Sequence, residues 1–99
     1  MEEYELMVLT KQGLSISESS TMKDEEIKMW INAGKEDLKR QGIKTDLKNA
    51  LVQSAIVMYV KSNFGNVHIK EKELSQRTYN LLCKNLSLSS EYKVVDDNA

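Results

Sequence analysis

An apolar segment in the middle of the chain limits its possible folds more than any other feature. Residues Ala50 to Val60 read ALVQSAIVMYV, and their apolar side chains cover most of the circumference of a helix. Such a helix is surrounded by other helices of its own domain, or it shares one flank with another subunit. The segment contains Gln53 and Ser54 and covers roughly half of the ~20 residues that a membrane span needs. We therefore expect a central core helix and no transmembrane segment.

The chain has no proline and only four glycines, three of which fall where helical patterns stop. This punctuation predicts an all-α fold, a small bundle of about four helices around the central one. The first helix is expected over about residues 3–12, the second after a cap at Thr21, the third after a cap at Thr45, and the fourth over about residues 71–85.

The second helix has the clearest helical pattern. Its apolar positions follow the spacing i, i+3, i+4, i+7 and i+11, at Ile27, Trp30, Ile31, Gly34 and Leu38. Trp30 is therefore expected in the core, and Gly34 suggests that another backbone approaches closely there.

The polar side of the second helix and its end can also be predicted. Asp24 with Lys28 and Glu36 with Arg40 are spaced for ion pairs across one turn. Gly42 should end the helix.

The third and fourth helices carry the remaining aromatic residues. Asn63 and Gly65 tolerate a left-handed backbone and are expected to end the third helix, while Tyr59 and Phe64 are expected to be buried and to hold the exit against the core. In the fourth helix, one face carries Leu74, Thr78, Leu81 and Leu82, with Tyr79 and Leu86 beside it.

Residues 1–88 are expected to form a single helical domain, and residues 89–99 an extended C-terminal tail. The tail sequence EYKVV has strand propensity and offers Tyr92, Val94 and Val95 as contacts for a partner.

The titratable residues argue against an enzyme. The only cysteine, Cys83, and the only histidine, His68, are far apart in sequence, and a lone cysteine on a leucine-rich helix usually behaves as a small buried hydrophobe. Two such residues are too few for a structural zinc site, and no phosphate-binding glycine loop is present. We expect no catalytic residues, no metal and no cofactor.

Charge and cysteine content limit the possible partners of the protein and its cellular compartment. Fourteen basic and fifteen acidic residues nearly cancel, which argues against a dedicated nucleic-acid binder. A single cysteine and an acidic N-terminal sequence favour a protein made in a reducing cytoplasm without a secretory signal.

Two motifs in the second half of the chain resemble a known family. AIVMYVKSNFG includes Tyr59, Lys61, Asn63, Phe64 and Gly65, and SQRTYNLLCKNLSLSSEYK includes Tyr79, Leu82, Leu86, Leu88, Ser89 and Tyr92. These residues, within a similarity that covers about residues 23–93, resemble the small head-tail connector proteins of tailed phages, which are often labelled adaptor or DNA-packaging proteins. In this sequence Ser62 replaces the usual alanine of the first motif.

The resemblance implies a structural protein of the virion neck that is made in the bacterial host cytoplasm. It implies a ring under the portal protein. This ring offers a platform to the next connector or stopper protein and lets DNA pass without specific binding. In such a ring, surplus apolar surface would be buried between neighbouring copies.

Two other functions compete with that of a connector. A small helical DNA-binding regulator would place two helices around QGIKT as a helix-turn-helix, but the recognition helix would then be DLKNALVQSAIVMYV, which is too apolar to face a DNA groove. An unspecified protein-interaction module is the other alternative.

Overall fold

The computed structural model describes residues 2–65 and 67–88, and all regular structure in this part of the chain is α-helical. The helices are α1 (Glu2–Gly13), α2 (Asp24–Arg40), α3 (Ala50–Asn63) and α4 (Ile69–Leu88). The predicted all-α bundle of four helices is therefore confirmed. The expected C-terminal tail, with Tyr92, Val94 and Val95, lies outside the described residues.

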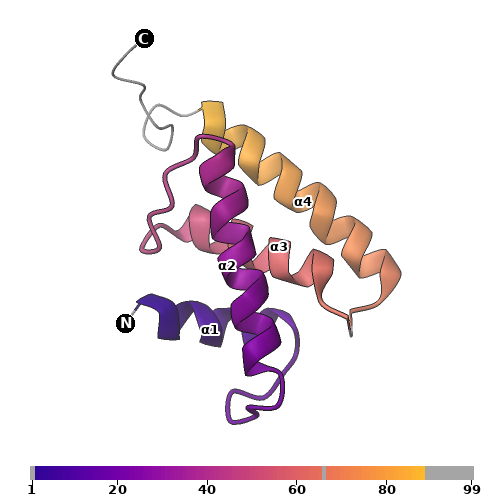
Figure 1. Cartoon of the computed structure of the whole chain (residues 1–99). Coiled ribbons are helices and arrows are strands. Elements are labelled where there is room, and N and C mark those ends of the chain that lie inside the picture. The colour runs from indigo at the N-terminus through magenta and orange to yellow at the C-terminus, as the bar shows by residue number, and fades with distance from the viewer. Residues whose placement is uncertain (1, 66, 89–99) are drawn as a thin grey trace.

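The helix α3 is the centre of the bundle, because α1, α2 and α4 all pack against it. In the view of Figure 1, α3 crosses behind α2, with α4 on one side of it and α1 on the other. The apolar pattern of residues 50–60 thus predicted the central helix correctly. The outer side of α3 is nonetheless open to solvent, since Leu51 is 45% exposed.

Side chains from all four helices form one hydrophobic core. Its buried apolar members are Leu6, Ile27, Ile31, Leu38, Ile43, Val52, Ala55, Ile56, Val60, Phe64, Tyr79, Cys83 and Leu86. Burial of these side chains supplies the main driving force for folding, at about 1.5–3 kcal/mol for each large aliphatic or aromatic residue.

Both predicted N-terminal caps are wrong. The residue before α2 is Lys23, which makes no side-chain capping bond, and the Thr21 carbonyl instead accepts a hydrogen bond from the Asp24 backbone at 3.2 Å. The cap of α3 is Asn49, whose Oδ1 accepts from the Leu51 and Val52 backbone N–H groups at 2.9 and 3.2 Å.

The helix α3 begins later than its predicted cap at Thr45 because a turn comes first. Asp46 accepts the Lys48 N–H at its Oδ1 and the Asn49 N–H at its backbone carbonyl, at 3.1 and 3.0 Å. Such local side-chain bonds compete with helix, so the helix starts only where Asn49 replaces them with a cap.

Gly42 ends the second helix as predicted. Its φ is +77°, its N–H donates to Lys39 O at 2.9 Å, and the Ile43 N–H donates to Leu38 O at 3.0 Å. This is a Schellman motif, and its hydrophobic pair, Leu38 and Ile43, is buried.

The same motif ends α1, but with serine in the left-handed position. Ser15 has φ +58° and donates to Gln12 O at 3.2 Å, and the Ile16 N–H donates to Lys11 O at 2.8 Å. Gly13 has a different purpose, because a Cβ there would lie 2.8 Å from Val57 Cγ1. Gly13 therefore allows α1 to approach α3 closely.

The end of α3 differs from the prediction. Phe64 caps it in an extended conformation, φ −71° and ψ 131°, and its N–H donates to Val60 O at 2.8 Å. Among the described residues only Ser15 and Gly42 have positive φ, so neither Asn63 nor Gly65 is left-handed. Asn63 instead donates through its side chain to Tyr59 O at 2.8 Å.

The predicted one-turn ion pairs of α2 are also replaced by other partners. Lys28 lies 3.8 Å from Glu25, and Lys39 lies 3.6 Å from Glu36. Arg40 pairs with Asp37, and Asp24 reaches across to Lys11 of α1. Three of these pairs have i, i+3 spacing, which brings side chains together on a helix as i, i+4 does.

Candidate interaction surface

Three aromatic rings from three helices form a row inside the bundle. The Tyr59 ring of α3 lies edge-on to Tyr79 of α4, with centroids 5.2 Å apart, and tilted against Trp30 of α2 at 6.4 Å. Gly34 makes room for this row, since a Cβ there would lie 3.1 Å from Tyr59 Cδ1. A side chain, and not the predicted backbone, therefore approaches Gly34.

The predicted burial of these aromatic residues is right only in part. Phe64 is 1% exposed and Tyr79 2%, so both are in the core. Tyr59 and Trp30 are only half-buried, and they pack against the core from its edge. The indole Nε1 of Trp30 is buried without a hydrogen-bond partner among the described residues. Gly65 is exposed in the loop before α4.

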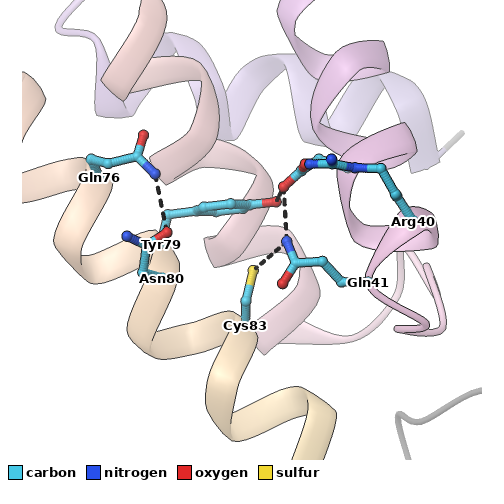
Figure 2. A network of polar contacts seen from close by, with 7 residues as sticks. Arg40, Gln41, Gln76, Tyr79, Asn80 and Cys83 are labelled. Carbon is cyan, nitrogen blue, oxygen red and sulfur yellow. Dashed lines mark hydrogen bonds and ion pairs between the residues drawn. The ribbon is translucent and has the colours of Figure 1, made fainter.

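A polar network joins α4 to the end of α2. Figure 2 shows the Tyr79 ring extending from α4 toward Arg40 and Gln41. Its hydroxyl donates to Asp37 Oδ2 at 2.5 Å, the same oxygen that accepts from Gln41 Nε2 at 2.8 Å. Gln41 Nε2 also contacts Cys83 Sγ at 3.7 Å.

The electrostatics of this network are those of a structural contact. Burial alone would raise the pKa of Asp37, but hydrogen bonds from Tyr79, Arg40 and Gln41 outweigh it and hold that pKa below its ordinary value. Burial and the bond to Asp37 raise the pKa of the Tyr79 hydroxyl far above its usual range. Burial also raises the pKa of the Cys83 thiol, which keeps the sulfur in its less reactive protonated form.

Cys83 and His68 do not form a catalytic pair. His68 is exposed before the first turn of α4, where its Nδ1 accepts the Lys70 N–H at 3.2 Å. Cys83 is buried roughly 20 Å further along the same helix. The imidazole thus helps to cap α4.

The described part of the chain offers no candidate metal site and no candidate membrane segment. No three His, Cys, Asp or Glu side chains of residues 2–65 and 67–88 are grouped to hold a metal ion. None of the described helices combines the length and hydropathy that crossing a membrane requires.

A hollow of about 480 Å³ lies between α1, α2 and their connecting loop. Lys11 lines it and is 4% exposed. Its Nζ lies 2.8 Å from Asp24 Oδ1 and donates to the backbone carbonyls of Ser20 and Glu18 at 2.7 and 3.2 Å. All three ammonium hydrogens have acceptors here, so Lys11 of α1 holds both the connecting loop and the start of α2.

The most prominent apolar feature of the surface is a row of leucines on α4, which we call the leucine stripe: Leu74, Leu81 and Leu88. They are 58%, 61% and 76% exposed. Residues seven apart lie almost on one line along a helix, so the three side chains form a row in which neighbours are separated by about two helical turns.

The exposure of the leucine stripe corrects the prediction for α4. The residues that face the core are Ser75, Tyr79, Cys83 and Leu86, while Leu74 and Leu81 of the predicted face point to solvent. Exposing a strip of leucines is costly for an isolated protein and is typical of a surface that binds another protein.

A row of cations, which we call the basic row, runs beside the leucine stripe and consists of Lys70, Arg77 and Lys84. All three residues are exposed, and each precedes a stripe leucine by four positions, which places it on the adjacent line of the helix surface. The seven-residue spacing of both rows is present in the sequence, but leucines at this spacing equally fit a buried face, and only the packing of α4 on α3 shows that they are exposed.

Comparison with known proteins identifies the family. The family model described as phage connector protein matches residues 6–93. No curated protein and no solved structure matches the chain. The match includes α2, α3 and α4 entire, with both motifs that suggested a connector. The chain therefore belongs to the phage connector protein family.

Proposed function

We propose that this protein is a structural component of the virion neck, where copies form a ring under the portal and connect the DNA-filled head to the tail or stopper. The observation that carries the proposal is the leucine stripe on a member of the phage connector family. Three exposed leucines in line give each copy an apolar surface that a monomer leaves in water.

The proposed partners are the portal protein, the next connector or stopper protein, and further copies of the chain. Synthesis would take place in the host cytoplasm, before assembly on the head. The near balance of acidic and basic residues suits a ring through which DNA passes without being gripped.

We divide the chain into the helical domain, residues 1–88, and a C-terminal tail, residues 89–99, that contacts the portal or an adjacent subunit. The sequence EYKVV supports this assignment, because its strand propensity suits addition to the edge of a partner's sheet and it offers Tyr92, Val94 and Val95 as contacts. Deletion of residues 91–99 should then weaken attachment to purified portal-containing heads. Attachment equal to that of the full chain would exclude the tail from the contact.

The packing of α3 weighs against a DNA-binding regulator. A recognition helix presents polar side chains to the DNA groove, whereas α3 is packed against by α1, α2 and α4 and its exposed residues are Ala50, Leu51 and Ser54. Catalysis is not part of the proposal, because the contacts of His68, Tyr79 and Lys11 serve helix capping and helix packing.

Electron microscopy of assembled particles tests the neck assignment. We expect density for a ring of this protein between the portal and the tail, and its loss in particles made without the gene. Particles with no copies at that position would refute the proposal.

A pair of variants tests the surface. Leu81→Asp places a charge on the leucine stripe and should prevent joining to heads, whereas Asn80→Asp, on the neighbouring exposed position, should join normally. Equal thermal melting of both variants would show that the loss is not a folding defect.

A further inference from the structure

A second apolar surface lies between α1 and α3, which we call the α1–α3 groove. It consists of two adjoining hollows that share Leu9 and Gln53, and its apolar wall is formed by Val8, Leu9, Val57 and Met58. Leu9 is 37% exposed at the groove. This groove is formed by α1 and α3, whereas the leucine stripe is exposed on α4, so one copy can use both surfaces at the same time. In Figure 1, α1 and α4 lie on opposite sides of α3.

Beyond the first turns of α4, which carry Glu71 and Glu73, the charges beside the two surfaces are opposite. The α1–α3 groove has Glu5 and Glu18 on its rim. The leucine stripe has the basic row along one side. An apolar strip edged by cations thus matches an apolar groove edged by carboxylates, which favours this pairing over others during encounter.

We infer that the leucine stripe of one copy packs into the α1–α3 groove of the next copy, with the basic row of the first facing the acidic rim of the second. A helix that lays its apolar face in a groove is a recurrent mode of protein recognition. The inference rests on the proposed function, in that it names the faces through which copies of the proposed ring meet.

The contact is head-to-tail, because its two surfaces are different. Contacts of this kind generate a ring when the rotation between copies closes. Pairing of two leucine stripes in antiparallel orientation would instead set basic row against basic row, and like charges in contact are unfavourable. It would also leave the α1–α3 groove empty on both copies.

Cysteine cross-linking on portal-containing heads tests the contact. The background variant Cys83→Ala removes the native thiol, and Leu9→Cys and Leu81→Cys are then introduced together at exposed positions. Mild oxidation of head-bound protein should give a ladder of dimers, trimers and higher species, since every copy can link to two neighbours. Circular dichroism melting checks that each variant is folded.

The single-cysteine chains are the matched controls. In a head-to-tail contact, Leu81→Cys alone and Leu9→Cys alone should give no cross-linked species. Dimers from Leu81→Cys alone would show stripe-to-stripe pairing and overturn the inference. Head-bound, folded double-cysteine protein that gives no ladder would also overturn it, while leaving the neck assignment intact. Failure of wild-type protein to join heads would refute the proposed function itself.

Charge reversal gives an independent readout. Arg77→Glu with Lys84→Glu should lower the number of head-bound copies by about fivefold, which corresponds to the loss of two exposed ion pairs. Adding Glu5→Lys to the same chain should recover part of that loss, because each interface then regains a pair of opposite charges. If Glu5→Lys lowers binding further, the acidic rim does not face the basic row and the inference is wrong.

Discussion

The hydroxyl of Tyr79 and the carboxylate of Asp37 meet at 2.5 Å although they are far apart in sequence and lie on α4 and α2. The helix α4 packs mainly on α3, so this hydrogen bond and the nearby contact of Gln41 with Cys83 are polar links from α4 to the end of α2. Removing the hydroxyl leaves a partly buried carboxylate with fewer donors.

Tyr79→Phe is therefore expected to destabilise the protein by about 1.5–3 kcal/mol, the range for hydrogen bonds to charged groups. Urea denaturation measures the change. Tyr59→Phe is the matched control, because the Tyr59 ring is half-buried in the same aromatic row and the contacts described for it are made by its ring. An equal loss in both variants would show that the hydrogen bond to Asp37 has no special importance.

The stability of the protein should depend on Asp37 in acid. The pKa of Asp37 is lower in the folded state than its ordinary value of 3.8. Its carboxylate thus stabilises the fold fully above that value, and the contribution is lost as the pH falls through the folded-state pKa. The stability difference between wild type and Asp37→Asn, measured by urea denaturation, should be larger at about pH 6 than at about pH 2. A difference independent of pH would contradict the assignment.

Both Schellman motifs predict that glycine is the most stable residue at the left-handed position. Ser15 holds φ +58° with a Cβ, so Ser15→Gly should stabilise the protein by about 1 kcal/mol through relief of left-handed strain. Gly42→Ala, at φ +77°, should destabilise it by a similar amount. Thermal melting of the pair gives the test, and a loss of stability in Ser15→Gly would show that the serine side chain contributes more than its backbone strain costs.

Phe64→Ala should destabilise the domain by about 3–5 kcal/mol, as expected for truncation of a core aromatic residue. Phe64 is 1% exposed and packs where α3 ends. Leu74→Ala is the control, since Leu74 is 58% exposed and its loss should leave melting nearly unchanged. Unchanged melting of Phe64→Ala with lost binding to heads would mean that Phe64 is a contact residue and not a core residue.

Lys11→Met should destabilise the protein by about 1.5–3 kcal/mol, because it leaves Asp24 and two backbone carbonyls without their donor. Lys28→Met removes an exposed lysine from α2 and should change stability by less than about 0.5 kcal/mol. Chemical denaturation of both variants provides the comparison. Similar small effects would show that the loop after α1 is held by its backbone bonds alone.

Much of the fold follows from patterns that are local in sequence. The apolar residues of 50–60 indicate the central helix, and Gly42 supplies the left-handed residue that ends α2. The cap of α3 is harder to predict, because Thr45 and Asn49 are both suitable residues. Only the turn at Asp46 decides in favour of Asn49.

The surface of α4 shows why the candidate site could not be read from composition. Two lines of residues on α4 have helical spacing, and the line with more leucine is the exposed one. The other line is buried because Tyr79 reaches both the Tyr59 ring and Asp37, and these come from distant parts of the chain. Hydrophobicity alone ranks the two lines in the opposite order.

The central position of α3 also has a consequence for how quickly the protein folds. Its most extensive contacts join α2 to α3 and α3 to α4, and the helices of each pair are consecutive along the chain. Contacts between successive helices require only short loops to close, and chains with such low contact order fold in microseconds to milliseconds. Each copy can therefore complete its own folding well before it encounters a neighbour, so that assembly proceeds from preformed subunits.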